Sequence, residues 1–236
     1  MGVTTVTKKG SSVSKKDFLS EIKAIESLEG WRPYQVLSKF LTCAHSALSK
    51  PTLPKNFQNE REQDYMRIVL SCTSPARTMR HISNMMGILT LSLEESLHDF
   101  LGPVFMEVSA SKSMGQFFTP ESVCNLAAEI SLKDMVSALE KQSHIMIDEP
   151  ASGSGAMLIA CCNLAAGKGI NYQEKLSFSF SDLDKDAYMS CYIQMSLAGC
   201  VARSFHRNSL SMETFSKDIT PMSLVRPHLL LKPTHN

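Results

Sequence analysis

The strongest constraint on folding lies between His144 and Gly155, where a short apolar run passes directly into a turn of small residues. Residues 144–148 favour a buried β-strand, and residues 156–166 have the apolar content of a buried helix. Between them, Gly153 and Gly155 allow dihedral angles that other residues rarely adopt, and they let a ligand approach the backbone. The start of the following helix offers unpaired N–H groups. The segment therefore predicts a strand–turn–helix unit of the nucleotide-binding kind.

This turn differs from two common phosphate-binding motifs and has an acidic partner downstream. A dinucleotide fingerprint needs a third glycine where the chain has Leu158, and no Gly-Lys-Ser/Thr ending follows. The apolar run 176–180 leads to Asp182 and Asp184. A carboxylate at the end of the second strand can accept both ribose hydroxyls. An ordinary tight turn is the alternative for the glycines alone, and a helix N-cap is the alternative for one of the two aspartates.

The chain changes character near residue 110. Before that point the apolar spacing predicts helices at 16–29, 34–48, 60–72 and 77–108, the last interrupted near Gly102-Pro103. Afterwards strands are expected at 144–148, 176–180, 200–205 and 224–231. Helices are expected between them at 121–130, 156–166 and 185–197. This alternation is typical of an α/β sheet. We expect a flexible tail (1–15), a helical N-terminal region (16–110) and an α/β domain (111–236).

Composition excludes several classes of protein. With 43% apolar and 20% charged residues, the chain resembles neither a disordered nor a fibrous protein. The net charge of +1 gives no indication of a nucleic-acid-binding protein. The seven cysteines form no Cys-x-x-Cys pair and the seven histidines show no ligand spacing, so we expect no metal site. No leader or membrane segment is expected, which favours a cytoplasmic protein.

Two ordered segments resemble the modification subunits of type I restriction–modification systems, which are adenine-N6 DNA methyltransferases. Residues 149–155, Glu-Pro-Ala-Ser-Gly-Ser-Gly, resemble the family's first motif, Asp/Glu-Pro-Ala-x-Gly-Ser/Thr-Gly. Residues 115–120, Gly-Gln-Phe-Phe-Thr-Pro, resemble its Gly-Gln-Tyr/Phe-Phe/Tyr-Thr-Pro signature, and residues 98–102 resemble its lead-in. The resemblance extends over about residues 93–210. It implies a Rossmann-like methyltransferase sheet, here partial, behind an all-helical N-terminal region, with S-adenosyl-L-methionine as cofactor.

The resemblance also implies roles for individual residues. Thr119 and Pro120 would meet the methionine end of the cofactor, and residues 149–155 would wrap its amino-acid portion and sulfonium. Asp182 would hold the ribose, with Leu183 against the adenine ring. In addition, Asn208 stands where the family usually has an aspartate that contacts the adenine amine, and an amide can both accept and donate there. The implied cofactor-binding residues are Thr119, Pro120, Glu149, Pro150, Ala151, Gly153, Gly155, Asp182, Leu183 and Asn208. Thr119 and Pro120 also suit the start of a helix, and Phe117 and Phe118 suit core packing.

The family clamps its flipped target base with Asn/Asp-Pro-Pro-Tyr/Phe after the fourth strand. This sequence has no Pro-Pro, and only Lys232 to Asn236 follow the expected strand at 224–231. The catalytic residues therefore stay unknown, while the cofactor site is retained. One alternative is a non-catalytic homologue whose helical region docks a modification or specificity subunit. Another is a methyltransferase for a protein or small molecule, because this fold supports many chemistries. The signature at 115–120 favours either of the first two readings over a methyltransferase for a protein or small molecule, and the resemblance implies DNA as the partner.

We expect that this chain alone does not methylate DNA. The adenine amine is a weak nucleophile, and transfer depends on groups that hold the flipped base in line with the methyl donor. The measurement is nucleoside analysis for N6-methyladenine after incubation with mixed-sequence DNA and methyl-labelled S-adenosylmethionine. Multiple turnovers without any partner would contradict this expectation.

Overall fold

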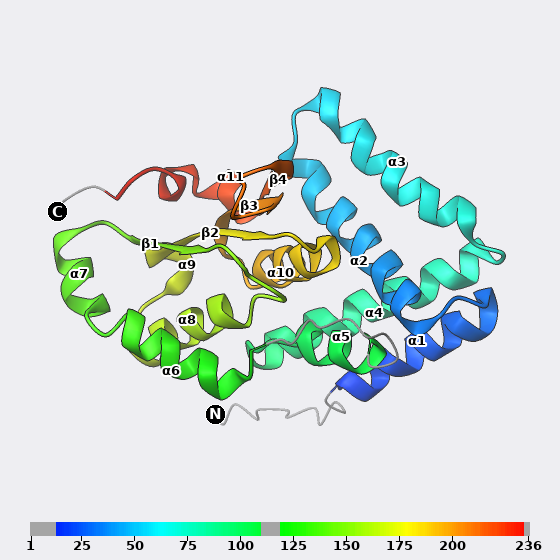
Figure 1. Ribbon diagram of the computed structural model, residues 1–236, viewed down its shortest axis with the longest axis horizontal. Helices are drawn as coiled ribbons and strands as arrows, with labels where there is room; N and C mark the ends of the chain where they lie inside the picture. The colour runs from blue at the N-terminus through cyan, green and yellow to red at the C-terminus, as the bar shows by residue number, and fades with distance from the viewer. Residues whose placement is uncertain (1–12, 110–118, 234–236) are drawn as a thin grey trace, which may run out of the picture.

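The first half of the described chain is helical, and the second half builds a sheet (Figure 1). The computed structural model describes residues 13–109 and 119–233. The first-half elements are α1 (Lys15–Glu29), α2 (Pro33–Ser49), η1 (Lys50–Thr52), α3 (Lys55–Ser71), α4 (Pro75–Glu95) and α5 (Leu101–Ser109). The expected helical N-terminal region is thus confirmed over these residues. No described helix has both the length and the apolar composition that crossing a membrane requires.

Helix α1 shows how local sequence sets the helix ends. Ser14 and Asp17 form a capping box, in which the Ser14 N–H donates to Oδ2 of Asp17 at 2.9 Å. The helix ends at Gly30, whose φ of 69° is left-handed and suits glycine. Between these ends Phe18 is fully buried, with its ring 5.2 Å from that of Phe40 and 5.4 Å from that of Phe100. Phe18 therefore ties three segments of the helical region together.

The break within the predicted helix 77–108 lies earlier than expected. The chain leaves helical geometry over residues 96–100, and Gly102 and Pro103 lie in the first turn of α5. Proline fits there because a helix leaves its first N–H groups unpaired in any case. The extended backbone of Ser96 ends α4 instead. Helix α3 also begins at Lys55, five residues before the predicted start.

The second half contains a four-stranded sheet of order β1-β2-β3-β4. Its elements are α6 (Glu121–Ser131), α7 (Met135–Lys141), β1 (Ile145–Glu149), α8 (Ala156–Gly167), α9 (Tyr172–Lys175), β2 (Leu176–Asp182), α10 (Lys185–Leu197), β3 (Val201–Arg207), β4 (Thr214–Ile219), α11 (Met222–Val225) and η2 (Pro227–Leu230). Strands β1, β2 and β3 are parallel, and β4 runs antiparallel to β3. The first three predicted strands and the helices after 120 are confirmed within about two residues.

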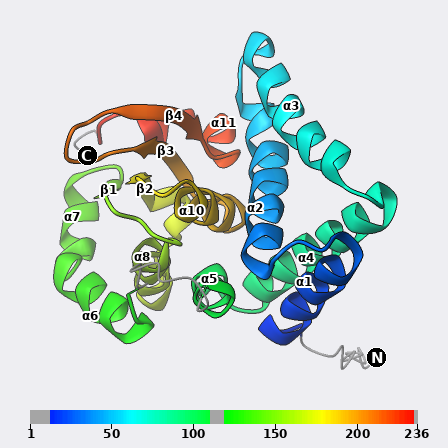
Figure 2. The ribbon, with the colours of Figure 1, turned by 45° about the vertical axis from the view of Figure 1, so that its right-hand side comes forward.

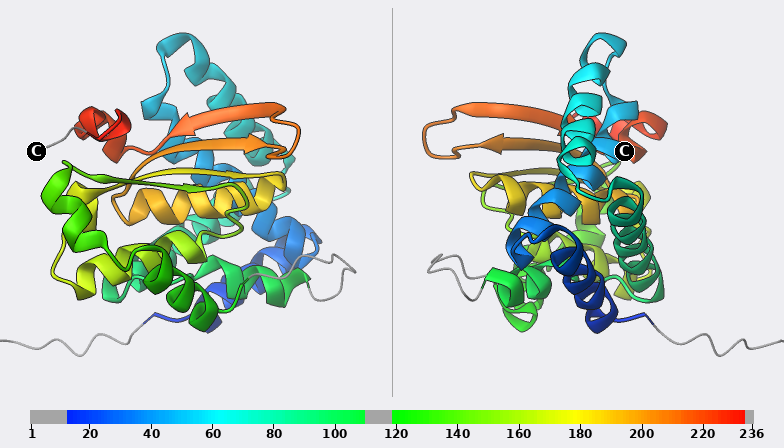
Figure 3. Two further views of the ribbon diagram at one scale, coloured as in Figure 1. Left: turned by 60° about the vertical axis from the view of Figure 1, so that its left-hand side comes forward. Right: turned by 90° about the vertical axis from the view of Figure 1, so that its right-hand side faces the viewer.

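One face of the sheet is packed against helices. Phe178 and Phe180 of β2 are buried on the face that also carries Ser204 of β3. The hydroxyl of Tyr188 on α10 reaches Ser204 at 3.3 Å, so α10 covers this face. Figure 2 shows α10 beside α2, and the left view of Figure 3 shows helices beneath the strands. A single buried cluster includes residues of both halves of the chain.

The predicted strand at 224–231 is wrong. Residues 222–225 form α11 and residues 227–230 form η2, because Pro227 fixes φ and has no N–H for a sheet ladder. The actual fourth strand is β4, which returns along β3 after the loop that contains Asn208. Its sequence, Thr-Phe-Ser-Lys-Asp-Ile, shows no apolar run. The strand is therefore specified by its pairing with β3 and by a buried charge.

That buried charge is Asp218 of β4, and it joins the sheet to the helical region. Its side chain is fully buried, and Arg61 of α3 donates through one nitrogen to both carboxylate oxygens at 2.8 and 2.7 Å. The Tyr188 hydroxyl donates to Oδ2 at 2.7 Å. Burial opposes ionisation, but His45 and Arg61 favour it more strongly and hold the pKa of Asp218 well below its ordinary value. Asp218 is therefore a buried anion with a nearby cation.

His45 of α2 packs beside this carboxylate. Its Nε2 lies 3.3 Å from Oδ2 of Asp218 but has no well-aligned hydrogen bond. Burial lowers the pKa of His45, and the nearby carboxylate only partly opposes this. The ring packs edge-on against Tyr188 and Tyr192 of α10, with centroids 5.5 and 4.7 Å away. Arg61 is the side chain that donates hydrogen bonds to both oxygens of Asp218.

We expect Arg61→Leu to lower the free energy of unfolding by about 3 kcal/mol at pH 7, because it leaves Asp218 buried without its cation. The measurement is urea unfolding at several pH values. Since the pKa of Asp218 is lowered in the folded state, its stabilising contribution is present at neutral pH and is lost as pH falls below about 4. The difference in the free energy of unfolding between the variant and the wild type should therefore become smaller in acid.

The matched control is Arg67→Leu on the same helix. Arg67 pairs with Asp64 at 2.9 Å, but 73% of its side chain is exposed. Exposed pairs contribute at most about 1 kcal/mol. Equal losses for the two variants would show that the buried pair has no special role.

Candidate functional site

The site begins with the turn between β1 and α8. Gly153 has a φ of 55° and Gly155 a φ of 102°, and side chains disfavour both conformations. A Cβ on Gly155 would also lie 3.1 Å from Sγ of Cys191. The Gly155 N–H donates to the Ser152 carbonyl at 2.8 Å, which closes the turn. The two glycines are therefore required by the backbone path, as the sequence predicts.

Asp182, at the end of β2, connects that strand to the glycine turn. Its Oδ2 accepts the Gly153 N–H at 2.8 Å, and its Oδ1 accepts the Asp184 N–H at 2.9 Å. Each oxygen keeps a further lone pair for a ligand. Asp184 is the helix N-cap of α10, with its side chain accepting the Ala187 N–H at 2.8 Å. The alternative role for one aspartate of the pair is thus confirmed for Asp184.

Two serines that sequence reasoning missed also hold the turn. The hydroxyls of Ser181 and Ser209 both donate to the Pro150 carbonyl, at 3.2 and 2.5 Å. The Ser152 N–H donates to the Ser181 carbonyl at 2.9 Å. The ends of β1, β2 and β3 are therefore joined at one edge of the sheet. The available signal is position, because Ser181 and Ser209 both follow the apolar part of a parallel strand.

The charge at this edge is negative. Oε1 of Glu149 accepts the Ala151 N–H at 3.0 Å. Burial raises the pKa of Glu149, and the charges of Asp148 and Asp182 raise it further. A phosphate would be repelled here, whereas an amino or sulfonium group would relieve the repulsion between the carboxylates. The site therefore suits a cationic ligand that also carries hydroxyls.

Leu183 and Asn208 follow β2 and β3 at this edge, and they differ in how far their side chains are already engaged. The Leu183 side chain is 58% exposed and offers an apolar surface for a ring. Oδ1 of Asn208 accepts the N–H groups of Leu210 and Ser211 at 3.0 and 3.2 Å. Both lone pairs of this oxygen are thus engaged within the loop. A bond from an adenine amine to the oxygen would compete with the loop's own structure.

Thr119 and Pro120 are exposed at the start of α6. Pro120 is the N-cap, and its carbonyl accepts the N–H groups of Val123 and Cys124 at 3.0 and 3.1 Å. Burial raises the pKa of the Cys124 thiol, and the charges of Asp99, Glu121 and Glu149 raise it further. Residues 115–118 of the signature lie outside the described residues.

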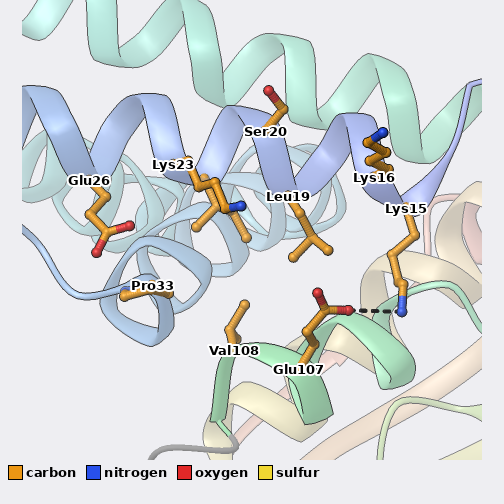
Figure 4. Close-up of a pocket in the computed structure, with 10 residues that line it drawn as sticks. Lys15, Lys16, Leu19, Ser20, Lys23, Glu26, Pro33, Glu107 and Val108 are labelled. Atoms are coloured by element: carbon orange, nitrogen blue, oxygen red, sulfur yellow. Dashed lines mark ion pairs between the residues drawn. The ribbon is translucent and has the colours of Figure 1, made fainter.

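A groove on the described surface lies away from the glycine turn. It has a volume of about 650 Å³ and lies between α1, the start of α2 and α5 (Figure 4). Leu19 and Val108 line it, and an ion pair of 2.9 Å joins Lys15 to Glu107 across it. None of the predicted site residues lines this groove. Within residues 13–109 and 119–233, no three His, Cys, Asp or Glu side chains gather as a metal site would require.

Comparison with known proteins identifies the fold and the family. A protein described as a modification subunit of a type I restriction enzyme from Vibrio vulnificus YJ016 matches with a TM-score of 0.50 at 10% identity, over 86% of this chain and 58% of its own. The fold is that of an α/β methyltransferase with a helical N-terminal region. A sequence model of the family described as N-6 DNA methylase matches residues 101–225. The chain belongs to this family, since the match covers more than half of it.

Two further structures are similar at lower scores. A protein described as a class I S-adenosylmethionine-dependent methyltransferase from Listeria monocytogenes gives a TM-score of 0.44 at 13% identity, over 83% of this chain and 54% of its own. A type I restriction-modification system methyltransferase subunit from Streptococcus thermophilus gives 0.38 at 16% identity, over 78% and 36%. The chain thus spans about half, or less, of each structure's length. No curated protein sequence matches the chain.

Proposed function

We propose that the chain binds S-adenosyl-L-methionine at the glycine turn and serves adenine-N6 methylation of DNA. The observation that carries this proposal is the bond between Asp182 and the Gly153 N–H, because it places a carboxylate with spare lone pairs beside the turn. The negative edge favours a cationic cofactor over a dinucleotide. Membership of the N-6 DNA methylase family supports adenine in DNA as the substrate.

The proposed roles follow the geometry of the turn. Asp182 accepts the ribose hydroxyls, and Leu183 contacts the adenine ring. Glu149 faces the amino group of the methionine portion, while the backbone of 150–155 surrounds it. Thr119 and Pro120 approach this end from α6. For Asn208 we propose a contact to the adenine through its amide, which the bonds within its loop oppose.

The proposal extends to setting and partners. We propose that the helical N-terminal region, residues 16–110, is a domain that docks a specificity or modification subunit, and that residues 111–236 form the cofactor domain. A cytoplasmic location fits the seven free cysteines.

Titration calorimetry should show binding of S-adenosylmethionine or S-adenosylhomocysteine in preference to NAD. The acidic edge attracts the charged methionine portion, whereas it repels the pyrophosphate of NAD. Binding of neither methyl-cycle ligand to the folded protein would overturn the cofactor assignment. Preferential NAD binding would point to a dinucleotide site instead.

We expect Asp182→Ala to weaken S-adenosylhomocysteine binding at least tenfold, since hydrogen bonds to a charged group contribute about 1.5–3 kcal/mol each. Asp184→Ala is the matched control. It removes the α10 N-cap at a cost of about 1 kcal/mol of stability and leaves affinity less changed. Calorimetry and thermal unfolding of both variants separate the two effects. If Asp184→Ala reduces affinity more than Asp182→Ala, the ribose contact is wrongly placed.

A further inference from the structure

The break between α4 and α5 places Asp99 against the glycine turn, although 55 residues separate it from Ser154 in the sequence. The Ser154 hydroxyl donates to Oδ2 of Asp99 at 2.6 Å. Oδ1 of the same carboxylate accepts the Gly102 N–H at 3.0 Å. Ser154 is 1% exposed and lies between the two glycines of the turn. Asp99 thus joins the start of α5 to the residue between the two glycines of the turn.

Gln194 of α10 completes this connection and is itself fully buried. Its Nε2 donates to Oδ1 of Asp99 at 2.9 Å and to the Ser154 carbonyl at 2.8 Å. Its Oε1 accepts the N–H groups of Phe100 and Leu101 at 2.8 and 3.2 Å. All four hydrogen-bonding positions of the amide are therefore used. A buried network that is fully satisfied specifies one arrangement of the groups it joins.

The network leaves no space for a side chain at residue 102. A Cβ at this position would overlap Oδ2 of Asp99 and lie 2.7 Å from Oγ of Ser154. The obstructing atoms are side-chain ends, so an added methyl group would separate the Asp99–Ser154 bond before it moved the backbone. Glycine at a helical position otherwise costs about 0.5–1 kcal/mol relative to alanine. The close approach explains why α5 has glycine there.

We propose that Asp99 is a positioning residue for the cofactor turn, acting through Ser154 and supported by Gln194. With Ser154 held from both its hydroxyl and its carbonyl, the flanking Gly153 and Gly155 lose much of their conformational freedom before a ligand arrives. Such preorganisation raises affinity because less ordering remains to be done on binding. Through the network, the conformation of the turn also depends on the position of α5 relative to α10. This inference rests on the proposed cofactor function only for its effect on affinity.

The test compares two glycine-to-alanine variants. Gly102→Ala should separate Asp99 from Ser154, whereas a Cβ on Gly87, within α4, meets no atom within 4 Å. Both changes favour helix formation, and thermal unfolding of both variants shows how much stability the overlap at residue 102 costs. We expect amide hydrogen exchange of residues 153–156 to accelerate about tenfold in Gly102→Ala and to stay unchanged in Gly87→Ala. Affinity for S-adenosylhomocysteine should fall about tenfold in the first variant alone.

A double-mutant cycle tests whether Asp99 acts through Ser154. Asp99→Ala and Ser154→Ala should each weaken S-adenosylhomocysteine binding about tenfold, and the double variant should lie within about twofold of Asp99→Ala, because both changes remove the bond between these two side chains. If the fold-losses of affinity in the two single variants multiply in the double variant, the inference is wrong. Glu29→Gln serves as control, since Glu29 accepts the N–H groups of Thr73 and Ser74 before α4. The affinity of Glu29→Gln for S-adenosylhomocysteine should equal that of the wild type, even if this variant unfolds at a lower temperature.

The two readouts separate this inference from the proposed function. Unchanged exchange at the turn in folded Gly102→Ala would overturn the positioning role. Faster exchange, with no binding of S-adenosylhomocysteine by the wild type, would support the positioning of the turn and refute the cofactor assignment.

Discussion

The hydrogen bond from the Gly153 N–H to Asp182 is the interaction on which the site depends. It joins the turn after β1 to the end of β2, which is possible because parallel strands present their carboxyl ends at one edge of the sheet. Ser181 strengthens the same junction from β2, and Ser209 does so from the loop after β3. The geometry of the site therefore comes from backbone groups held by short polar side chains.

The helical region is attached to this sheet by two polar clusters with different roles. One is the buried pair of Asp218 and Arg61, which connects β4 to α3. The other is the network of Asp99 and Gln194, which connects the start of α5 to the turn. The first cluster is a charged pair that lies outside the glycine turn, and its role is in stability. The second touches the turn itself, so the seating of α5 and the shape of the cofactor site are linked.

The sequence predicted the strand–turn–helix unit better than it predicted the end of the sheet. The turn with Gly153 and Gly155 and the acidic strand end are local patterns, because a few neighbouring residues define them. The fourth strand was misplaced because residues 224–231 are rich in leucine, whereas β4 is polar and contains the buried Asp218. The break near residue 100 was misplaced because proline at the start of a helix resembles proline that interrupts one.

By itself the sequence determined the positions of most helices, the first three strands, the glycine turn and the two aspartates after β2. It also determined membership of the N-6 DNA methylase family. Only the tertiary structure decided which carboxylates meet which partners. Asp99 and Gln194 are 95 residues apart, and Arg61 and Asp218 are 157 apart. No local pattern encodes such pairs, because the packing of α5, α10 and α3 around one core brings their partners within hydrogen-bonding distance.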